Sequence, residues 1–242
     1  MMRVYLISRP TLDFIEYNRF LADEGLPKEA GYHVEPSSDG EMLAEIAGRL
    51  CYMSYGKGRK TTKAFIEHIV DVGHFSVLEH ANWTFIFTGV SRSLTHELVR
   101  HRHFSFSQLS QRYVDESNAE MVMPELVKGD LMAESAAKEA FETTQHLYKH
   151  LVGYLETRFR AQNPEASDVE VRKAVRQAAR SVLPNATETK ITVTGNARAW
   201  REFIQKRKHP AADVEIRALA TLVLDTLKKE APSIFVDMGD EA

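Results

Sequence analysis

The sequence of 242 residues contains a single cysteine, Cys51. One cysteine excludes an internal disulfide, and it predicts a cytoplasmic protein rather than a disulfide-rich secreted one. Cys51 lies on the apolar side of a helical pattern. We therefore expect its side chain to be buried as a small, unreactive hydrophobic group.

Long apolar runs and a strong net charge are also missing. No stretch approaches the roughly 20 apolar residues that a membrane span needs, and the apolar part of the opening segment is too short for a secretory signal. The net charge is −3, which does not favour a general nucleic-acid or anionic-membrane surface. We expect neither a nucleic acid nor a membrane as a partner.

Common nucleotide and metal motifs are absent as well. The chain lacks a GxGxxG fingerprint, a GKS/T phosphate loop and a CxxC pair, so any bound phosphate must be held in another way. Five histidines lie between His74 and His103, but they do not form HExxH and have no cysteine ligands nearby. We expect no metal site, and we expect His74 and His80 to make structural hydrogen bonds.

The apolar periodicity predicts an α/β protein of the α+β style, with one domain over residues 1–242 and a central mixed or antiparallel sheet flanked by long helices. Strands are expected at residues 3–7, 82–89 and 191–195. Helices are expected at residues 41–53, 61–72, 91–100 (with Ser91 as the cap), 133–161, 168–183, 197–207 and 213–230. Residues 11–40 contain several Gly and Pro residues and are expected to be rich in loops.

A dense basic stretch, RHRHFSFSQLSQRY, runs from Arg100 to Tyr113. No Asp or Glu lies between Glu97 and Asp115, so the cations repel one another by about 0.2–0.5 kcal/mol for each close pair on a helix surface. An anion would remove that repulsion and add charge-assisted hydrogen bonds. The simpler alternative is a solvated helix end. Neighbouring serines and Gln108 offer neutral donors and acceptors, which favours a nucleotide over a bare ion.

Four segments of the chain together resemble the flavin-dependent thymidylate synthases. Arg100-His101-Arg102, followed after seven residues by Ser110, resembles the signature of that family. GHFSVLEH (73–80), RQAARSVLPNATET (176–189) and TGNARAWREFIQKR (194–207) resemble further segments of the family in the same order. The resemblance covers residues 41–235 approximately and is especially close to actinobacterial members.

The resemblance implies a reaction and an assembly. Members of the family make dTMP from dUMP, with a methylene group from 5,10-methylenetetrahydrofolate and electrons from NADPH through FAD. They are homotetramers whose flavin sites are built from several subunits. Side chains and helix ends from different chains would then hold the cofactor, which would explain why the Rossmann fingerprint is missing.

The resemblance also implies roles for individual residues. Arg207 matches the catalytic arginine that favours the ionised N3 of uracil, and no enzyme nucleophile is needed. A guanidinium at the N3/O4 edge would stabilise negative charge there and raise the electron density at C5. The residues that match flavin contacts are Ser76, Arg100, His101, Arg102, Gln108, Asn196, Ala197, Arg198 and Glu202. The residues that match dUMP contacts are Glu97, Leu98, Val99, Arg100, Gln108, Leu109, Ser110, Gln111, Arg112, Arg180 and Arg207.

Several of these residues also have a simpler structural interpretation. Ser76–Glu79 fits a capping box, and Asn196 fits an N-cap. Arg180 could belong to a solvated row of arginines on its helix, and Arg207 could be an ordinary basic helix end. Glu202 is a departure, because relatives often carry a neutral or imidazole side chain at that position.

Two other functional classes remain open from the residues alone. A nucleic-acid-binding module would use the same basic stretch, with its rings Phe104, Phe106 and Tyr113, and would bind polynucleotides with a strong dependence on salt. A metallohydrolase would use the histidine cluster and would need a metal for activity. Flavin absorbance in the purified protein separates both classes from a flavoenzyme.

Overall fold

The computed structural model describes residues 1–27 and 38–239, and the chain divides into two compact units. Unit 1 comprises residues 1–3, 87–100 and 107–191, and unit 2 comprises residues 4–86, 101–106 and 192–242. All four strands contribute residues to both units, the two longest being β2 (Asn82–Ser91) and β4 (Glu188–Asn196). The single domain expected over residues 1–242 stays a prediction.

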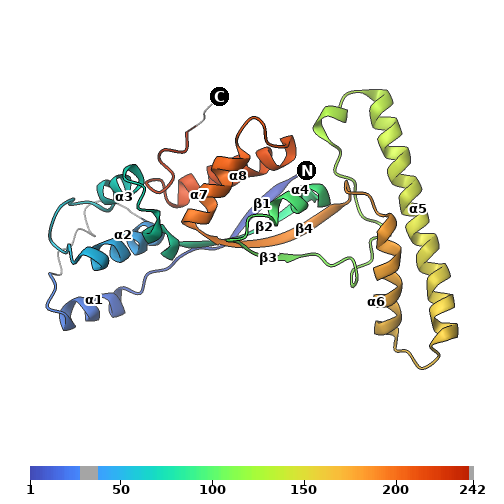
Figure 1. Ribbon diagram of the computed structural model, residues 1–242, viewed down its shortest axis with the longest axis horizontal. Coiled ribbons are helices and arrows are strands. Elements are labelled where there is room, and N and C mark those ends of the chain that lie inside the picture. Colours follow the sequence, from blue (N-terminus) through green and yellow to red (C-terminus); the bar gives the residue numbers. More distant parts are fainter. Residues whose placement is uncertain (28–37, 240–242) are drawn as a thin grey trace. The chain divides into compact units, whose positions relative to one another are not determined.

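The four strands form one sheet with the order β1-β2-β4-β3 (Figure 1). The sheet is antiparallel, and together with the abundant helices it confirms the predicted α/β class. The outer strands are β1 (Arg3–Ser8) and β3 (Ser105–Gln108). β3 lies inside the basic stretch, where no strand was predicted. Its residues alternate between exposed and half-buried, as expected for a strand at the edge of a sheet.

Unit 2 is built around large aromatic side chains. The ring of Phe85 on β2 meets Trp200 edge to face, with centroids 5.0 Å apart, and Trp83 meets Phe235 at 6.2 Å. Such pairs bury much apolar surface and prefer this geometry. The helices of unit 2 are α1 (Phe14–Asp23), α2 (Asp39–Tyr52), α3 (Thr62–Asp71), the 3₁₀ helix η1 (Phe75–His80), α7 (Ala197–Arg207) and α8 (Val214–Glu230).

Helix α1 corrects the prediction that residues 11–40 are rich in loops. Asp13 caps the helix, because its carboxylate accepts hydrogen bonds from the backbone N–H groups of Ile15 and Glu16 at 3.0 and 3.1 Å. Tyr17 and Leu21, one helical turn apart, bury their side chains. A cap followed by an apolar i, i+4 pair is a helix signal that the nearby Gly and Pro residues obscured. The rest of that prediction, at residues 28–37, lies outside the described residues.

Unit 1 contains three α-helices, each within or close to a range predicted as helical. They are α4 (Arg92–Leu98), α5 (Leu131–Gln162) and α6 (Asp168–Ala179), and α5 and α6 pack side by side (Figure 1). Ser91 caps α4 as predicted, since its hydroxyl accepts from Leu94 N at 3.0 Å. The helix predicted over 168–183 is split instead. Its last turn tightens into a 3₁₀ helix, η3 (Arg180–Val182), before Pro184.

The prediction for Cys51 is wrong, because its side chain is exposed in the structure. Cys51 lies in the last turn of α2, and its neighbours Leu50 and Tyr52 are also exposed. The apolar spacing in this helix therefore continues past the part that is buried. The buried face of α2 includes the smaller side chain of Ala44 and the charged side chains of Glu45 and Arg49.

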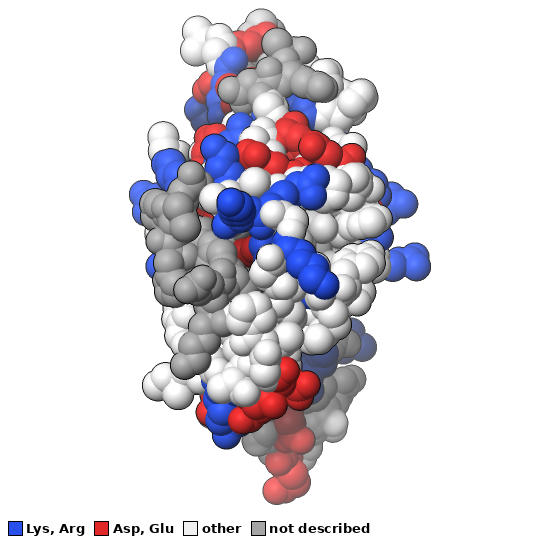
Figure 2. Space-filling model, turned by 90° about the vertical axis from the view of Figure 1, so that its left-hand side faces the viewer, with Lys and Arg blue, Asp and Glu red and all other residues white. Residues whose placement is uncertain are grey.

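Charges of both signs share the face of the molecule that carries α1, α2 and α3. Figure 2 shows Lys and Arg side chains gathered in the middle of this face, with Asp and Glu side chains above and below them. The mixture agrees with the small net charge of −3. Among the helices of the described residues, none combines the length and the apolar character that a bilayer crossing requires.

Candidate active site

The residues that the sequence singles out fall into two groups, one in each unit. Unit 2 contains most of the predicted flavin residues and the predicted catalytic residue, namely Ser76, His101, Arg102, Asn196, Ala197, Arg198, Glu202 and Arg207. Unit 1 contains most of the predicted dUMP residues, with two that have both roles, namely Glu97, Leu98, Val99, Arg100, Gln108, Leu109, Ser110, Gln111, Arg112 and Arg180.

In unit 2 the structure brings Arg207 and His101 into contact. Arg207 ends α7, and its Nε donates a hydrogen bond to Nε2 of His101 at 2.9 Å. The imidazole is held in turn by aromatic rings, because it meets Phe203 edge to face at 5.2 Å and lies 6.1 Å from Phe104. Arg207, at the end of the segment 194–207, thus contacts His101, the middle residue of the Arg100-His101-Arg102 motif.

His101 is neutral in this environment. Burial and, to a smaller extent, the positive charges of Arg207 and Lys206 lower the pKa of its imidazole to about 4, whereas Glu202 acts in the opposite direction. A neutral imidazole has one donor and one acceptor nitrogen. Since Nε2 accepts from Arg207, we assign the proton of the neutral ring to Nδ1.

Phe104, one ring of the basic stretch, lies in the core of unit 2. It is 7% exposed and packs on Trp200 with centroids 4.3 Å apart. A Cβ added at Gly195 would lie 2.3 Å from Cδ1 of Phe104, so only glycine fits at this point of β4. Trp200 donates its indole N–H to the carbonyl of the same glycine at 3.1 Å. The turn from β4 into α7 is therefore fixed directly beside His101.

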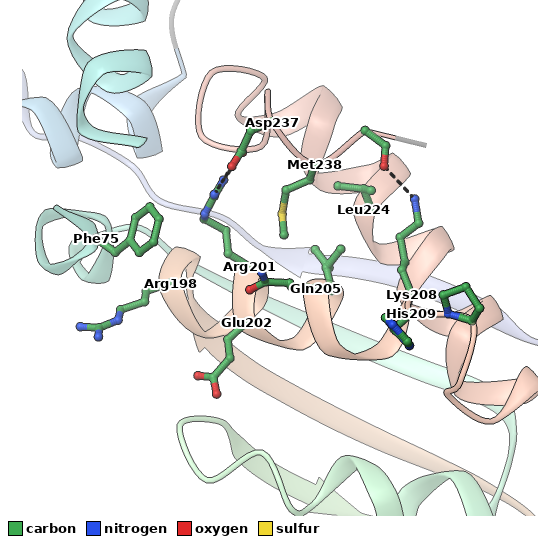
Figure 3. Close-up of a pocket in the computed structure, with 13 residues that line it drawn as sticks. Phe75, Arg198, Arg201, Glu202, Gln205, Lys208, His209, Leu224, Asp237 and Met238 are labelled. Carbon is green, nitrogen blue, oxygen red and sulfur yellow. Dashed lines mark hydrogen bonds and ion pairs between the residues drawn. The ribbon is translucent and has the colours of Figure 1, made fainter. Parts of the chain in front are cut away.

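Helix α7 also lines a cavity of about 590 Å³ in unit 2 (Figure 3). Arg201 points across it and forms a bidentate pair with Asp237, at 2.7 and 2.6 Å. Arg198 pairs with Glu79 at 2.6 Å, and Glu202 pairs with Lys206. The Lys206 hydrogen bond is the main cause that lowers the pKa of Glu202, so this carboxylate is ionised and locally neutralised.

The structural interpretation of Ser76 as a capping residue is wrong. Residues Phe75–His80 form a 3₁₀ helix whose N-cap is His74, and no side chain makes a capping hydrogen bond there. Glu79 pairs instead with Arg198. Asn196, by contrast, is confirmed as the N-cap of α7, since its Oδ1 accepts from Ala199 N at 2.9 Å.

In unit 1 the predicted dUMP residues surround the end of α4 and the residues after β3. Gln108 donates through its amide to Thr95 at 3.0 Å and to Thr189 at 3.4 Å. Leu98 and Gln111 are buried, whereas Val99 is 42% exposed. The half-buried amide of Gln108 ties β3 to α4 and β4, so the segment that follows it starts from a fixed point.

Buried arginine nitrogens without a partner are the most unusual feature of unit 1. Within the described ranges, Nη1 of Arg92 and Nε of Arg112 are both buried and make no hydrogen bond. Burial lowers the pKa of Arg92, and the nearby positive charge of Arg180 lowers it further, against the effect of Glu116. Buried donors are normally satisfied, so each of these two nitrogens is a candidate for contact with an anion.

Glu116 is the acidic member of the same group. It is 5% exposed, and burial raises the pKa of its carboxyl while the charge of Arg92 opposes that rise. The carboxylates of Glu188 and Asp115 raise its pKa as well, and the charge of Lys190 acts in the opposite direction.

Comparison with known proteins agrees with the motifs. The family model described as "Thymidylate synthase complementing protein" (Thy1) matches residues 34–233. The chain is 50% identical over 240 residues to a flavin-dependent thymidylate synthase of Mycobacterium sp. (strain KMS), covering 98% of this chain and 89% of that protein. The chain belongs to the flavin-dependent thymidylate synthase family. This confirms the resemblance, and with it that the chain is an enzyme of this family.

Further relatives with the same name are similar to this chain over a shorter alignment. The flavin-dependent thymidylate synthases of Mycobacterium tuberculosis (strain ATCC 25177 / H37Ra) and Mycobacterium bovis (strain BCG / Pasteur 1173P2) are both 51% identical over 201 residues. Each alignment covers 82% of this chain and 79% of the relative. These relatives of the family are mycobacterial, in agreement with the actinobacterial type read from the motifs.

Arg92 and Glu116 were not predicted from the sequence as site residues. Arg92 carried a signal that could have identified it. It occupies the first turn of α4, where the helix dipole disfavours a cation, so its presence there calls for another reason. Glu116 carried no such signal, because its burial depends on Tyr148, whose hydroxyl accepts from Glu116 N at 3.4 Å across the unit.

Proposed function

We propose that the protein converts dUMP to dTMP by reductive methylation, with 5,10-methylenetetrahydrofolate as the methylene donor and NADPH as the reductant through FAD. Family membership supports the reaction class. The structural support is that Nη1 of Arg92 and Nε of Arg112 are buried without a hydrogen bond. Both nitrogens could donate to the phosphate of a nucleotide substrate.

The residues of unit 2 fit FAD by their chemistry. A flavin dinucleotide carries a pyrophosphate, and guanidinium, imidazole and amide donors suit it. Arg102 and Arg198 are exposed cations on the two segments that match flavin contacts. Glu202 does not oppose this fit, because Lys206 neutralises its charge. We propose that Ser76, Arg100, His101, Arg102, Gln108, Asn196, Ala197, Arg198 and Glu202 line the cofactor site.

The residues of unit 1 fit dUMP. Arg92, Arg112 and Arg180 would hold the phosphate, and Gln108, Ser110 and Gln111 would supply neutral donors and acceptors. We propose that the predicted stretches Glu97–Arg100 and Gln108–Arg112 form this site. Ser110 binds the nucleotide in this scheme and does not act as a nucleophile.

Arg207 is the proposed catalytic residue. Its guanidinium would lie at the N3/O4 edge of uracil, stabilise negative charge on the ring and thereby raise the electron density at C5, which bonds to the methylene carbon. FAD, when bound, supplies the reducing equivalents of NADPH that complete the methyl group. The guanidinium is held at its Nε by the hydrogen bond to Nε2 of His101.

Tritium release from C5-labelled dUMP tests the reaction. With NADPH and the folate, the wild type should release tritium, and Arg207→Ala should lower kcat by about 10²- to 10³-fold, as for the loss of other charge-stabilising donors. Arg158→Ala, which removes an exposed arginine of α5, is the matched control and should retain full activity. Full activity of Arg207→Ala would remove the catalytic assignment.

The phosphate assignment has a separate test. Arg92→Met should weaken dUMP binding roughly 10- to 100-fold, the loss of a charged hydrogen bond. Binding of deoxyuridine, which lacks the phosphate, should not change. Equal losses for both ligands would contradict a phosphate contact at Arg92 and would indicate a general distortion of unit 1.

We further propose a homotetramer with active sites shared between subunits, located in the cytoplasm. Family membership supports this assembly, because the resemblance implies flavin sites built from several subunits. The single cysteine, Cys51, is exposed and would remain reduced in the cytoplasm.

A further inference from the structure

The turn that follows β3 in unit 1 is fixed at its start by β4. The backbone N–H of Leu109 donates to the carbonyl of Lys190 on β4 at 2.9 Å. The chain then turns, because the N–H groups of Tyr113 and Val114 both donate to the carbonyl of Ser110, at 3.1 and 3.0 Å. A turn anchored only at its start would leave its side chains free to move, so the contacts at its other end decide how well they are placed.

Helix α6 supplies an anchor at that other end through Arg176. Nη1 of Arg176 donates to the carbonyl of Tyr113 at 2.5 Å, and Nη2 donates to Oδ2 of Asp115 at 3.4 Å. The side chain of Arg176 is 16% exposed. The guanidinium group is rigid and planar, so it ties the end of the turn to α6 at two points. Helix α6 packs in turn against α5 (Figure 1).

Arg112 lies between the two anchors. Its backbone N–H donates to Oγ of Ser110 at 3.4 Å, and its Nε is buried without a hydrogen bond. The direction of this side chain depends on the backbone of the turn that carries it. Charge-assisted hydrogen bonds need a defined geometry, and ordering a loose side chain on binding costs free energy. A turn that is held at both ends therefore favours contact between Arg112 and an anion.

The arginines spaced by four residues near the end of α6 have different surroundings. Arg172 is exposed, whereas Arg176 is bound to the turn. Arg180 lies in η3, close enough to Arg92 for its charge to lower the pKa of that guanidinium, an effect smaller than that of burial. Both terminal nitrogens of Arg176 donate to acceptors of the chain itself, which favours a role in holding the turn over direct contact with a ligand.

We propose that Arg176 is a positioning residue that fixes the far end of the turn Ser110–Val114 and thereby places Arg112 for the phosphate of dUMP. This role rests on the proposed function, since it matters to the reaction only if the turn binds dUMP. Arg176 touches the backbone of the turn in this scheme, and not the nucleotide. The paired donors of its guanidinium, rather than its positive charge, are what binding requires.

Two substitutions separate the paired donors from the charge. Arg176→Met keeps much of the aliphatic stem and removes both donors. Arg176→Lys keeps the charge, but its single nitrogen on a different stem does not reproduce the planar fork. In the flavin-loaded enzyme both variants should bind dUMP about 10-fold more weakly, the scale of a lost hydrogen bond to a charged group. The KM for dUMP should rise with little change in kcat. Arg172→Met, one helical turn earlier, is the matched control and should behave like the wild type.

Three further readouts distinguish positioning from a general loss of structure. The double variant Arg112→Met, Arg176→Met should bind dUMP no more weakly than Arg112→Met alone, because Arg176 acts through Arg112. Binding of deoxyuridine, which lacks the phosphate, should not change in Arg176→Met. The amides of Tyr113 and Val114 should exchange their hydrogens faster in Arg176→Met than in the wild type or in Arg172→Met.

Several results would overturn the inference. They are wild-type binding of dUMP by Arg176→Met, full recovery by Arg176→Lys, additive losses in the double variant, and an equal loss of deoxyuridine binding. If Arg176→Met does not fold, Arg176→Lys takes its place with the same expected loss. Failure of the flavin-loaded wild type to bind dUMP would overturn the proposed function itself. The anchor would then be judged by hydrogen exchange, and unchanged rates at Tyr113 and Val114 would exclude it.

Discussion

At the scale of single residues, His101 should make the stability of the protein depend on pH. The folded chain protonates this imidazole only near pH 4, whereas an ordinary histidine does so near 6.5. Between these values the unfolded chain binds more protons, so the free energy of unfolding falls as the pH is lowered. The slope is at most about 1.4 kcal/mol per pH unit and is reduced by the partial exposure of the ring.

Urea denaturation of the wild type and of His101→Gln at pH 4.5, 5.5 and 7 measures this contribution. The stability that comes from the neutral imidazole is complete above pH 6.5 and is lost by about pH 4. Other titrating groups cancel in the comparison. The wild type should lose more stability than His101→Gln on acidification, and parallel curves would show that His101 titrates normally.

At the scale of secondary-structure elements, the junction of β4 with α7 depends on one glycine. In Gly195→Ala the new methyl group would lie 2.3 Å from the ring of Phe104. The ring must shift, and such overpacking typically costs about 1–3 kcal/mol. Because Phe104 packs beside His101, we expect catalysis to fall as well.

Gly153→Ala is the matched control for that substitution. Gly153 lies in α5, and nothing lies within 4 Å of an added Cβ. Alanine there should raise stability by up to about 1 kcal/mol, since glycine is a poor helix former. Thermal denaturation of both variants provides the comparison, and equal effects at the two sites would argue against the steric explanation.

We expect the stability of helix α2 to depend on a buried ion pair between Arg49 and Glu45. Arg49 and Glu45 are 2% and 0% exposed, and Arg49 also donates to the carbonyls of Ser54, Lys57 and Arg59, so it organises the loop after the helix. Arg49→Met would leave a buried carboxylate unpaired. The expected loss is about 3–5 kcal/mol in the free energy of unfolding.

Arg160 provides the control for this pair, because its pairs with Glu156 (i, i+4) and with Asp168 are both exposed. Exposed pairs of this kind contribute little, so Arg160→Met should leave the urea midpoint unchanged within error. A similar midpoint for Arg49→Met would show that the buried pair has no special role in stability.

At the scale of the whole molecule, we expect a homotetramer. Apolar side chains remain exposed in each unit, among them Tyr5 and Ile7 on β1, and Leu131, Met132 and Tyr154 on α5. Exposed apolar side chains of this size are candidates for contact with other subunits. Light scattering should give a mass of about 110 kDa, four times the 27.5 kDa of the chain. A mass of 27.5 kDa at micromolar concentration would exclude shared active sites.

The sequence by itself determined the local features of this protein. Helix caps such as Ser91 and Asn196, the long helix α5 and the strands β2 and β4 follow from periodicity and capping chemistry, which involve residues a few positions apart. The family could also be read from the chain, because its motifs are contiguous segments. The roles of the individual site residues remain predictions.

The tertiary structure alone decided which of those residues are buried, charged or paired. Burial and neighbouring cations lower the pKa of His101, and they come from α7, about a hundred positions along the chain. The burial of Arg92 and Glu116, the exposure of Cys51 and the pairing of Arg198 with Glu79 likewise depend on distant packing. Desolvation is set by everything that surrounds a group in space, and a pattern of neighbouring residues does not contain that information.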